Sequence, residues 1–433
     1  METDVLVRFN AWWRDGKVSE GLRRPYRRRM FAEVQKYMGM RQIVLVYGLR
    51  RVGKSTMLYQ MIDDLLRTVK PRRVLYFSFD DKRYGLDEVM DAYQQTVLHR
   101  TFEELQERVY LFLDEVQKID DWESRIKVYY DLYPNLKFIV SGSASIALRK
   151  AAKESLAGRI FDFALGPLGF DEFLEMQGVD VEKVLGAQDI WRRSVLPLFD
   201  RYLKYGSFPE LVGVEDDEIA RRYINEDVIE KIVYKDLPES FDIKDIGLLK
   251  ALVVMVTENP GMIIDFASIA RDLHRDQRTI ANYFEYLEFG MIVRFLLNFR
   301  GSPIASRRKL KKAYLATPNI SFASGRSLDL LMPGMRENQV LVVSGADFFY
   351  RNSFEVDFIA QKEGKIVGIE VKSSDADVAQ LAKLRGKFGS RVVGLVLVTE
   401  GEGGDSRGIT AIPLWRYCLS KGTDIAKVDK KGV

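Results

Sequence analysis

The chain is poor in the residues that build disulfides, zinc sites and histidine-based active sites. Its 433 residues include one cysteine, Cys418, which excludes an intrachain disulfide and a cysteine-rich metal centre. The two histidines, His99 and His274, are too few for a histidine-based zinc site. A Ser-His triad is also disfavoured, because a single histidine more often packs or faces solvent.

Long apolar runs are missing as well. The longest, such as residues 392–398, have the length of a strand and fall far short of the roughly 20 residues that a membrane-spanning helix needs. The first residues lack the basic segment and apolar stretch of a secretory signal. We therefore expect a soluble, cytoplasmic protein with no membrane partner.

Composition predicts a folded protein of several domains. The hydrophobic fraction is 47%, with 25 Phe and 20 Tyr, which excludes a disordered chain. The length favours two to four domains. Net charge says little about partners, because 66 Lys and Arg residues stand against 62 Asp and Glu residues. Local clusters of charge are more informative.

The stretch from Val44 to Thr56 predicts a buried strand, a glycine-bearing loop and the first turn of a helix. It fits the pattern G-x-x-x-x-G-K-[ST] in the context that this pattern requires. The residues assigned to phosphate binding are Gly48, Leu49, Arg50, Arg51, Val52, Gly53, Lys54, Ser55 and Thr56. Backbone N–H groups of the loop and the helix N-terminus form a cradle for phosphate oxygens. Lys54 would reach the β- and γ-phosphates, and the Ser55 hydroxyl would contact Mg²⁺.

The region around this loop has an α/β pattern. Near-continuous apolar strands alternate with helix-length segments, which predicts a parallel sheet covered on both faces. The strand candidates are residues 43–47, 74–79, 109–113 and 138–141. In such a sheet the ligand binds at the carboxyl ends of the strands.

Two of these strands end in polar residues. The strand at 109–113 delivers Asp114 and Glu115 to the sheet edge, where one carboxylate would hold Mg²⁺ and the other would act as general base on the attacking water. The strand at 138–141 leads into Ser141 and Ser143. Either serine would sense the γ-phosphate, or both belong to a simple turn before a helix capped by Ser145.

These motifs carry a resemblance to a family. The residues concerned are Gly48–Thr56, Phe112–Glu115, Ser141–Ser143, Leu156–Arg159 and Gly166–Leu174. The core from about Ile43 to Leu168 resembles the AAA+ ATPases, and more narrowly an archaeal and bacterial group in which this ATPase precedes a nuclease-like C-terminal domain. The resemblance implies ATP and Mg²⁺ as cofactors. It also implies that Arg159 is an arginine finger in a neighbour's site, which requires a homo-oligomeric ring such as a hexamer; a purely structural arginine is the alternative.

Beyond the core, the sequence predicts helical and DNA-binding segments. Residues 166–245 would form a helical lid. Within residues 246–300, two short helices (266–273 and 277–287) and an alternating stretch resemble a winged helix-turn-helix that binds DNA or serves only for packing. Its second helix would bury Ile280, Phe284 and Leu287 and leave Gln277, Arg278, Asn282 and Glu285 outward. Two further basic segments, 22–29 and 300–312, suit nucleic-acid contact or are a solvated face and a linker.

The last segment contains a second chemical candidate. Residues 354–361 and 366–372 predict a hairpin. A turn centred on Glu363 and Gly364 would place Asp357 across from Glu370, and Glu355 across from Lys372, all on one face. Opposed carboxylates repel unless a hard cation lies between them.

This arrangement resembles the PD-(D/E)xK nucleases. The resemblance implies Asp357 and Glu370 as Mg²⁺ ligands, Lys372 as the residue that orients the water, and Glu337 on the preceding helix as a third acid. Such a domain can also bind DNA without cutting it, and the same acids can form a solvated strand face paired with Lys372. The predicted division of the chain is an N-terminal extension with a basic segment (1–40), a P-loop ATPase core (41–165), a lid (166–245), a winged helix-turn-helix with linker (246–312) and a nuclease-like α/β domain (313–433).

The primary hypothesis is a Mg²⁺-dependent AAA+ ATPase that acts on DNA. In this hypothesis Lys54, Ser55, Asp114, Glu115 and Arg159 hydrolyse ATP, and the C-terminal modules bind or cut DNA. The second is a regulatory ATPase that controls assembly or a protein partner and does not cut DNA. A chaperone-like remodeller of proteins is a more distant third, against which the basic linker and the helix-turn-helix argue.

Overall fold

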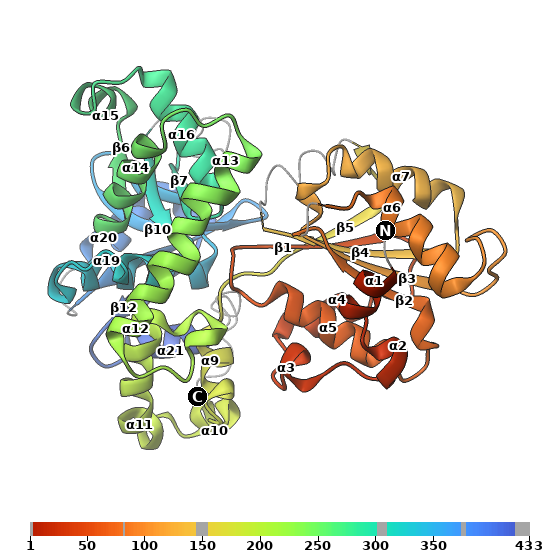
Figure 1. Ribbon diagram of the computed structural model, residues 1–433. Helices are drawn as coiled ribbons and strands as arrows, with labels where there is room; N and C mark the ends of the chain where they lie inside the picture. Colours follow the sequence, from red (N-terminus) through yellow and green to blue (C-terminus); the bar gives the residue numbers. More distant parts are fainter. Residues whose placement is uncertain (1–2, 81–82, 144–154, 301–309, 374–377, 421–433) are drawn as a thin grey trace. The chain divides into compact units, whose positions relative to one another are not determined.

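The computed structural model describes residues 3–80, 83–143, 155–300, 310–373 and 378–420 (Figure 1). The described chain divides into two compact units. The first comprises Met1–Gly166 together with Asp236–Asp242, and the second comprises Pro167–Lys235 together with Ile243–Val433. The chain therefore leaves the first unit, returns to it for a short segment, and leaves it again.

The described part of the first unit is built on a five-stranded sheet of parallel strands. The strands are β1 (Ile43–Tyr47), β2 (Val74–Ser78), β3 (Val109–Asp114), β4 (Leu136–Gly142) and β5 (Ile160–Ala164), in the order β2-β3-β4-β1-β5. Every residue of β1 and β4 is buried. This confirms the predicted parallel α/β sheet, and β5 extends it beyond the four strands expected.

Helices cover both faces of this sheet. The described α-helices of the first unit are α1 (Thr3–Phe9), α2 (Trp12–Asp15), α3 (Glu20–Arg23), α4 (Arg29–Gln35), α5 (Lys54–Leu65), α6 (Leu86–Tyr93) and α7 (Trp122–Leu132), with α13 (Leu237–Ser240) in the returning segment. In Figure 1, α5 lies on one side of the sheet and α7 on the other. The apolar strands are thus shielded from water on both faces, as their composition requires.

The N-terminal segment packs on the edge strand β2. The side chain of Asn10 accepts a hydrogen bond from the Tyr76 amide (2.6 Å) and donates one to the Tyr76 carbonyl (2.9 Å). The indole N–H groups of Trp12 and Trp13 both donate to the Val74 carbonyl. These side chains pair backbone groups that an edge strand otherwise leaves exposed. Residues 1–40 are accordingly part of the first unit.

Three arginines of the basic segment 22–29 make contacts within the first unit. Arg23 pairs with Asp63, and Arg27 pairs with Asp64 at 2.6 Å, so both neutralise acids of α5. Arg28 is buried, and its guanidinium donates to the carbonyls of Val52 (2.7 Å) and Gly166 (3.0 Å). These side chains therefore support α5 and the preceding loop, a role that the sequence did not indicate.

The second unit begins with helices and continues as a mixed sheet. Its first part contains α9 (Phe170–Met176), α10 (Val181–Gly186), α11 (Gln188–Arg201), η4 (Tyr202–Gly206), η5 (Pro209–Leu211), α12 (Asp217–Tyr223), η6 (Ile224–Ile229) and η7 (Ile232–Asp236), whose last residue belongs to the first unit. Its middle part contains α14 (Ile246–Glu258), β6 (Met262–Ile264), α15 (Phe266–Asp272), α16 (Gln277–Phe289), β7 (Val293–Asn298) and β8 (Lys311–Leu315). Its last part contains α18 (Asn319–Phe322), α19 (Leu328–Ser344), β9 (Phe348–Arg351), β10 (Glu355–Lys362), β11 (Lys365–Lys372), α20 (Ala379–Phe388), η8 (Gly389–Arg391), β12 (Val392–Thr399), β13 (Gly404–Ser406), β14 (Ile409–Pro413) and α21 (Leu414–Leu419).

One sheet runs through the middle and last parts of the second unit. Within the described residues its nine strands follow the order β13-β14-β12-β11-β10-β9-β7-β8-β6. The boundary predicted between residues 312 and 313 lies inside β8, so the basic linker ends before Lys311. Lys312 is a buried strand residue and not part of a phosphate-contacting loop. Residues 301–309 of that linker, and Ser145, lie outside the described residues.

The helices that the structure describes are all too short or too polar to cross a membrane.

Candidate functional site

The glycine-bearing loop connects the end of β1 to the start of α5. A Cβ atom added to Gly48 would lie 2.1 Å from the Leu165 carbonyl oxygen, so this position has no room for a side chain. Gly53 has φ = +96°, a conformation that glycine adopts without strain. The two glycines of the motif are thus required by close packing and by backbone geometry.

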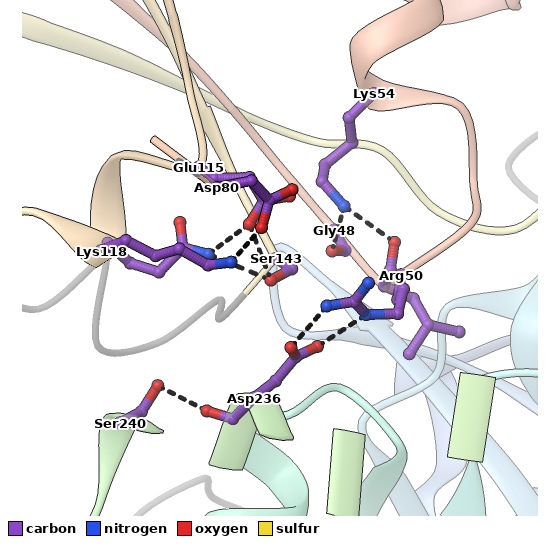
Figure 2. A network of polar contacts seen from close by, with 11 residues as sticks. Gly48, Arg50, Lys54, Asp80, Glu115, Lys118, Ser143, Asp236 and Ser240 are labelled. Atoms are coloured by element: carbon purple, nitrogen blue, oxygen red, sulfur yellow. Dashed lines mark hydrogen bonds and ion pairs between the residues drawn. The ribbon is translucent and has the colours of Figure 1, made fainter. Parts of the chain in front are cut away.

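Lys54 is buried in this loop. Its ammonium donates to the carbonyls of Gly48 and Leu49, each at 3.0 Å (Figure 2). Burial lowers the pKa of Lys54, and the negative charges of Glu115 and Asp114 oppose that shift. The cation is therefore held by the loop carbonyls, within electrostatic range of the two acids at the end of β3.

Asp114 collects hydroxyl donors from three other elements. Its carboxylate accepts hydrogen bonds from Ser55 (2.6 Å), from Tyr76 on β2 (2.9 Å) and from Ser141 on β4. Asp114 and Ser141 are both buried. The structure thus brings Ser55 and Asp114, the two predicted Mg²⁺ ligands, into direct contact, and Ser141, predicted to sense the γ-phosphate, contacts Asp114.

Glu115 follows in a left-handed backbone conformation, with φ = +55°. Its carboxylate accepts a hydrogen bond from Ser143 (3.3 Å; Figure 2) and another from Gln117, which also donates to Ser143. Burial raises the pKa of Glu115, while the charge of Lys54 works against this rise. A carboxylate with a raised pKa at the carboxyl edge of the sheet suits a general base.

The loop also carries an arginine that turns toward the returning segment. Arg50 donates to both carboxylate oxygens of Asp236, at 2.9 and 2.6 Å (Figure 2). Their side chains are 22% and 11% exposed, so the ion pair is largely shielded from water. Nearby, Lys118 forms an ion pair with Asp80.

Arg159 lies at the amino ends of the strands, on the opposite side of the sheet from the glycine-bearing loop. Its carbonyl accepts the amide of Ile43 at the start of β1, whereas the glycine loop follows the end of β1. Its guanidinium pairs with Asp131 at 2.9 Å. Arg159 therefore does not reach the nucleotide loop of its own chain.

The C-terminal hairpin has the predicted register. Phe358 lies opposite Ile369, and the turn residues Glu363 and Gly364 have φ values of +51° and +80°. This register places Asp357 across from Glu370. The Asp357 carboxylate accepts the Val371 amide at 2.9 Å.

Lysines and a tyrosine surround these acids. Lys372 pairs with Glu370 at 3.0 Å. Lys312 on β8 pairs with Glu355 at 2.9 Å and lies 3.6 Å from Glu337, whose carboxylate also accepts a hydrogen bond from Tyr314. The predicted acids thus gather around α19, β10 and β11, together with two cations.

The pKa values of these acids reflect burial and mutual repulsion. Burial raises the pKa of Glu337 to about 7 and that of Glu370 to about 7, and the charge of Asp357 adds to both shifts. Burial also raises the pKa of Asp357. Carboxylate oxygens are the ligands that Mg²⁺ prefers. Within the described residues, however, no three His, Cys, Asp or Glu side chains are arranged to hold a metal ion.

The fold and the loop geometry define the class of protein domain to which the first unit belongs. A parallel sheet, a G-x-x-x-x-G-K-[ST] loop after β1 and a Ser55–Asp114 pair at the neighbouring strand end are the features of a P-loop nucleotide-binding domain. Residues 40–174 match the family model described as an AAA domain. Residues 196–321 and 339–417 match two models described as domains of unknown function. The first unit therefore contains an AAA domain of the P-loop ATPase fold.

Similar proteins occur in archaea and bacteria. An uncharacterized protein of Methanocaldococcus jannaschii is 26% identical over 344 residues, which cover 75% of this chain and 73% of that protein. An uncharacterized protein of Haemophilus influenzae is 24% identical over 345 residues, which cover 76% and 82%. Among solved structures, the Aeropyrum pernix ORC1 protein in complex with DNA is 15% identical, covers 71% of this chain and 92% of that chain, and has a TM-score of 0.33. At that TM-score, the likeness assigns no function to this chain.

Sequence reasoning missed several residues at both sites. Among these residues, Gln117 gave the clearest signal in the sequence, because it lies two positions after Glu115. Tyr76 and Asp236 reach the nucleotide site from 38 positions before Asp114 and 186 positions after Arg50, which no local pattern reveals. At the second cluster the missed partner is Tyr314, and Lys312 was placed in the linker.

Proposed function

We propose that the protein is a Mg²⁺-dependent ATP hydrolase of the AAA+ type that acts on DNA. The observation that carries the ATPase proposal is the 2.6 Å hydrogen bond between Ser55 and Asp114, with Lys54 and Glu115 beside it. These four side chains come from two different strand-to-helix connections. Their convergence supports catalysis at the phosphate-binding loop.

Each residue has a chemical task in this proposal. The loop amides and Lys54 hold the β- and γ-phosphates. Ser55 and Asp114 offer the hydroxyl and carboxylate oxygens that would hold Mg²⁺, which when bound would draw negative charge from the phosphate oxygens. Glu115 orients a water molecule and accepts its proton, and its bonds from Gln117 and Ser143 fix the carboxylate for that task.

The proposal includes a homo-oligomeric ring, such as a hexamer. Arg159 stands at the sheet edge away from its own loop, so it would complete the site of a neighbouring subunit. There its guanidinium would stabilise the charge of the transition state. The ion pair with Asp131 is the competing structural role.

The proposed action on DNA is supported by α15 and α16. As predicted, Ile280, Phe284 and Leu287 are buried on α16. The outward residues Gln277, Arg278, Asn282 and Glu285 are exposed. Helix, strand, two helices and two strands follow in the order of a winged helix, with β6, β8 and β7 paired antiparallel. Polar side chains on an exposed second helix are what base contacts in a major groove require.

The carboxylate cluster supports two alternatives. Asp357 lies opposite Glu370 on the neighbouring strand, beside Lys372. This position supports a nuclease-like site in which Asp357, Glu370 and Glu337 bind metal. The ion pairs of Lys372 with Glu370 and of Lys312 with Glu337 favour the second candidate, a regulatory ATPase whose C-terminal domain does not cut DNA. In the described part of the chain, these acids are not arranged as a group of three that could hold a metal ion.

ATP turnover with and without DNA tests the primary proposal. Duplex, branched and single-stranded DNA are added to the full chain with Mg²⁺, and DNA binding is measured at low and at moderate salt. We expect one form to bind, to lose affinity steeply with salt, and to change the turnover rate. If no form binds at low salt and turnover is unchanged, the DNA proposal fails and the regulatory alternative stands.

A further inference from the structure

Arg50 stands apart from the other residues of the phosphate-binding loop. Its guanidinium, carried by that loop, is bound by the Asp236 carboxylate of the returning segment, Asp236–Asp242. In Figure 2, Lys54 points to the loop carbonyls and Arg50 points to Asp236. The bond with Asp236 raises the pKa of Arg50, and the charge of Glu115 adds to that rise. The Arg50 guanidinium is therefore within electrostatic range of Glu115, the proposed general base.

The partner of Arg50 lies on a segment with an unusual position in the chain. Asp236–Asp242 packs on the first unit, although the chain on both sides of it belongs to the second unit. Leu237 is buried, and Ser240 donates to the Asp236 carbonyl at 2.8 Å. The chain on both sides of this segment, ending at Lys235 and beginning at Ile243, belongs to the second unit.

A guanidinium binds carboxylate and phosphate with the same two-pronged geometry. A nucleoside triphosphate held by Lys54 would bring its terminal phosphate toward Glu115, and hence toward Arg50. This phosphate would compete with Asp236 for the same N–H groups. A diphosphate has no group at that position, so it leaves the ion pair in place.

We propose that Arg50 distinguishes nucleoside triphosphate from diphosphate by exchanging the Asp236 carboxylate for the terminal phosphate, which releases the segment Asp236–Asp242. This rests on the proposed function, because it assigns a regulatory role to the same nucleotide site. In this proposal, Arg50 makes the release of the segment Asp236–Asp242 depend on whether a triphosphate or a diphosphate is bound.

Two substitutions with opposite expected signs test the proposal. Arg50→Ala removes the phosphate contact, so the affinity for a non-hydrolysable ATP analogue falls about tenfold, as expected for a charge-assisted hydrogen bond. Asp236→Asn removes the competitor, so the same affinity rises by up to about tenfold. Neither changes the affinity for ADP by more than about threefold, since ADP does not engage Arg50.

A matched ion pair provides the control. Arg27 and Asp64 are also joined by two hydrogen bonds, one of 2.6 Å, but they lie outside the loop. Asp64→Asn should leave the ratio of the ATP-analogue and ADP affinities unchanged. Loss of a structural ion pair would change the affinities for the ATP analogue and for ADP together. The proposal is overturned if Arg50→Ala and Asp236→Asn each change these two affinities in the same direction.

Hydrogen–deuterium exchange on the full chain supplies the second readout. With the ATP analogue, amides of residues 237–242 should exchange faster than with ADP, and in Asp236→Asn they should exchange fast with either nucleotide. Equal exchange in the wild type with both nucleotides overturns the release step. A wild-type protein that binds neither nucleotide overturns the proposed function itself, whereas binding of both with an unaltered affinity ratio in the variants overturns only the role of Arg50.

Discussion

The Ser55 hydroxyl donates a 2.6 Å hydrogen bond to the Asp114 carboxylate, although 59 positions separate the two residues. Ser55 lies in the first turn of α5, after β1, and Asp114 ends β3. Parallel strands bring both to the carboxyl edge of the sheet, next to Lys54. Nucleotide binding and hydrolysis at this site would depend on these three side chains lying together.

Lys54→Met should abolish tight nucleotide binding. The substitution keeps an apolar stem in the buried site but removes the ammonium that would hold the β- and γ-phosphates. We expect the affinity for Mg²⁺-ATP to fall at least about a hundredfold, measured with a fluorescent nucleotide. Lys70→Met, at an exposed lysine in the first unit, is the control and should bind as the wild type does. Wild-type affinity in Lys54→Met would contradict the assignment of the loop.

Gly48→Ala should destabilise the first unit. The new Cβ would lie 2.1 Å from the Leu165 carbonyl oxygen, so β1 or the residues after β5 must move. We expect a loss of about 1–3 kcal/mol in the free energy of unfolding, typical of overpacking. Gly39→Ala adds a methyl group where nothing lies within 4 Å and should cost far less. Equal unfolding midpoints for the two variants would contradict this packing.

Lys137 should make stability depend on pH. It is buried on β4, its ammonium donates to the Tyr37 carbonyl at 2.9 Å, and burial lowers its pKa to about 8. Between this value and the ordinary one near 10.5, the folded protein has released a proton that the unfolded chain still binds, so stability rises with pH. Below pH 8 the lysine is charged in both states and the cost of burying it is complete.

Comparison with Lys137→Met isolates this effect from other titrations. The unfolding free energy of the wild type minus that of the variant should increase by about 3 kcal/mol as pH rises from 8 to 10.5. Chemical unfolding of the full chain at several pH values provides the measurement. A difference that stays constant, or falls, would show that Lys137 titrates normally.

Asp357→Asn tests the nuclease-like site. If the C-terminal cluster cuts DNA, cleavage with Mg²⁺ or Mn²⁺ should disappear in this variant, while ATP turnover should persist. Asp405→Asn, at an exposed edge strand, is the control and should cut as the wild type does. Metal-dependent cleavage that survives in Asp357→Asn would refute the assignment. Absence of cleavage in the wild type would favour the regulatory alternative.

Local patterns in the sequence predicted the parts whose geometry is set by neighbouring residues. The loop from Gly48 to Gly53 follows from glycine conformation and the flanking strand. The register of the C-terminal hairpin follows from a turn at Glu363 and Gly364, because two residues with positive φ fix which residues face each other. The buried face of α16 follows from helical periodicity.

Contacts between residues far apart in the chain could not be predicted from the sequence. The pairing of Arg50 with Asp236 spans 186 positions, and that of Asn10 with Tyr76 spans 66. Such pairs depend on how the chain folds back, which charge and spacing along the sequence do not specify. The five predicted segments fall into two units for the same reason, since strands such as β7, which pairs with both β8 and β9, find their partners through the folding of the chain in space.

We propose that Glu115 acts as the base for ATP hydrolysis at the Lys54 loop. The most direct measurement compares phosphate release by the wild type and by Glu115→Gln at saturating Mg²⁺-ATP, with nucleotide binding measured on the same samples. We expect Glu115→Gln to bind ATP as the wild type does and to hydrolyse it at least about a hundredfold more slowly. Hydrolysis at the wild-type rate in Glu115→Gln, or ATP binding without hydrolysis by the wild type, would contradict it.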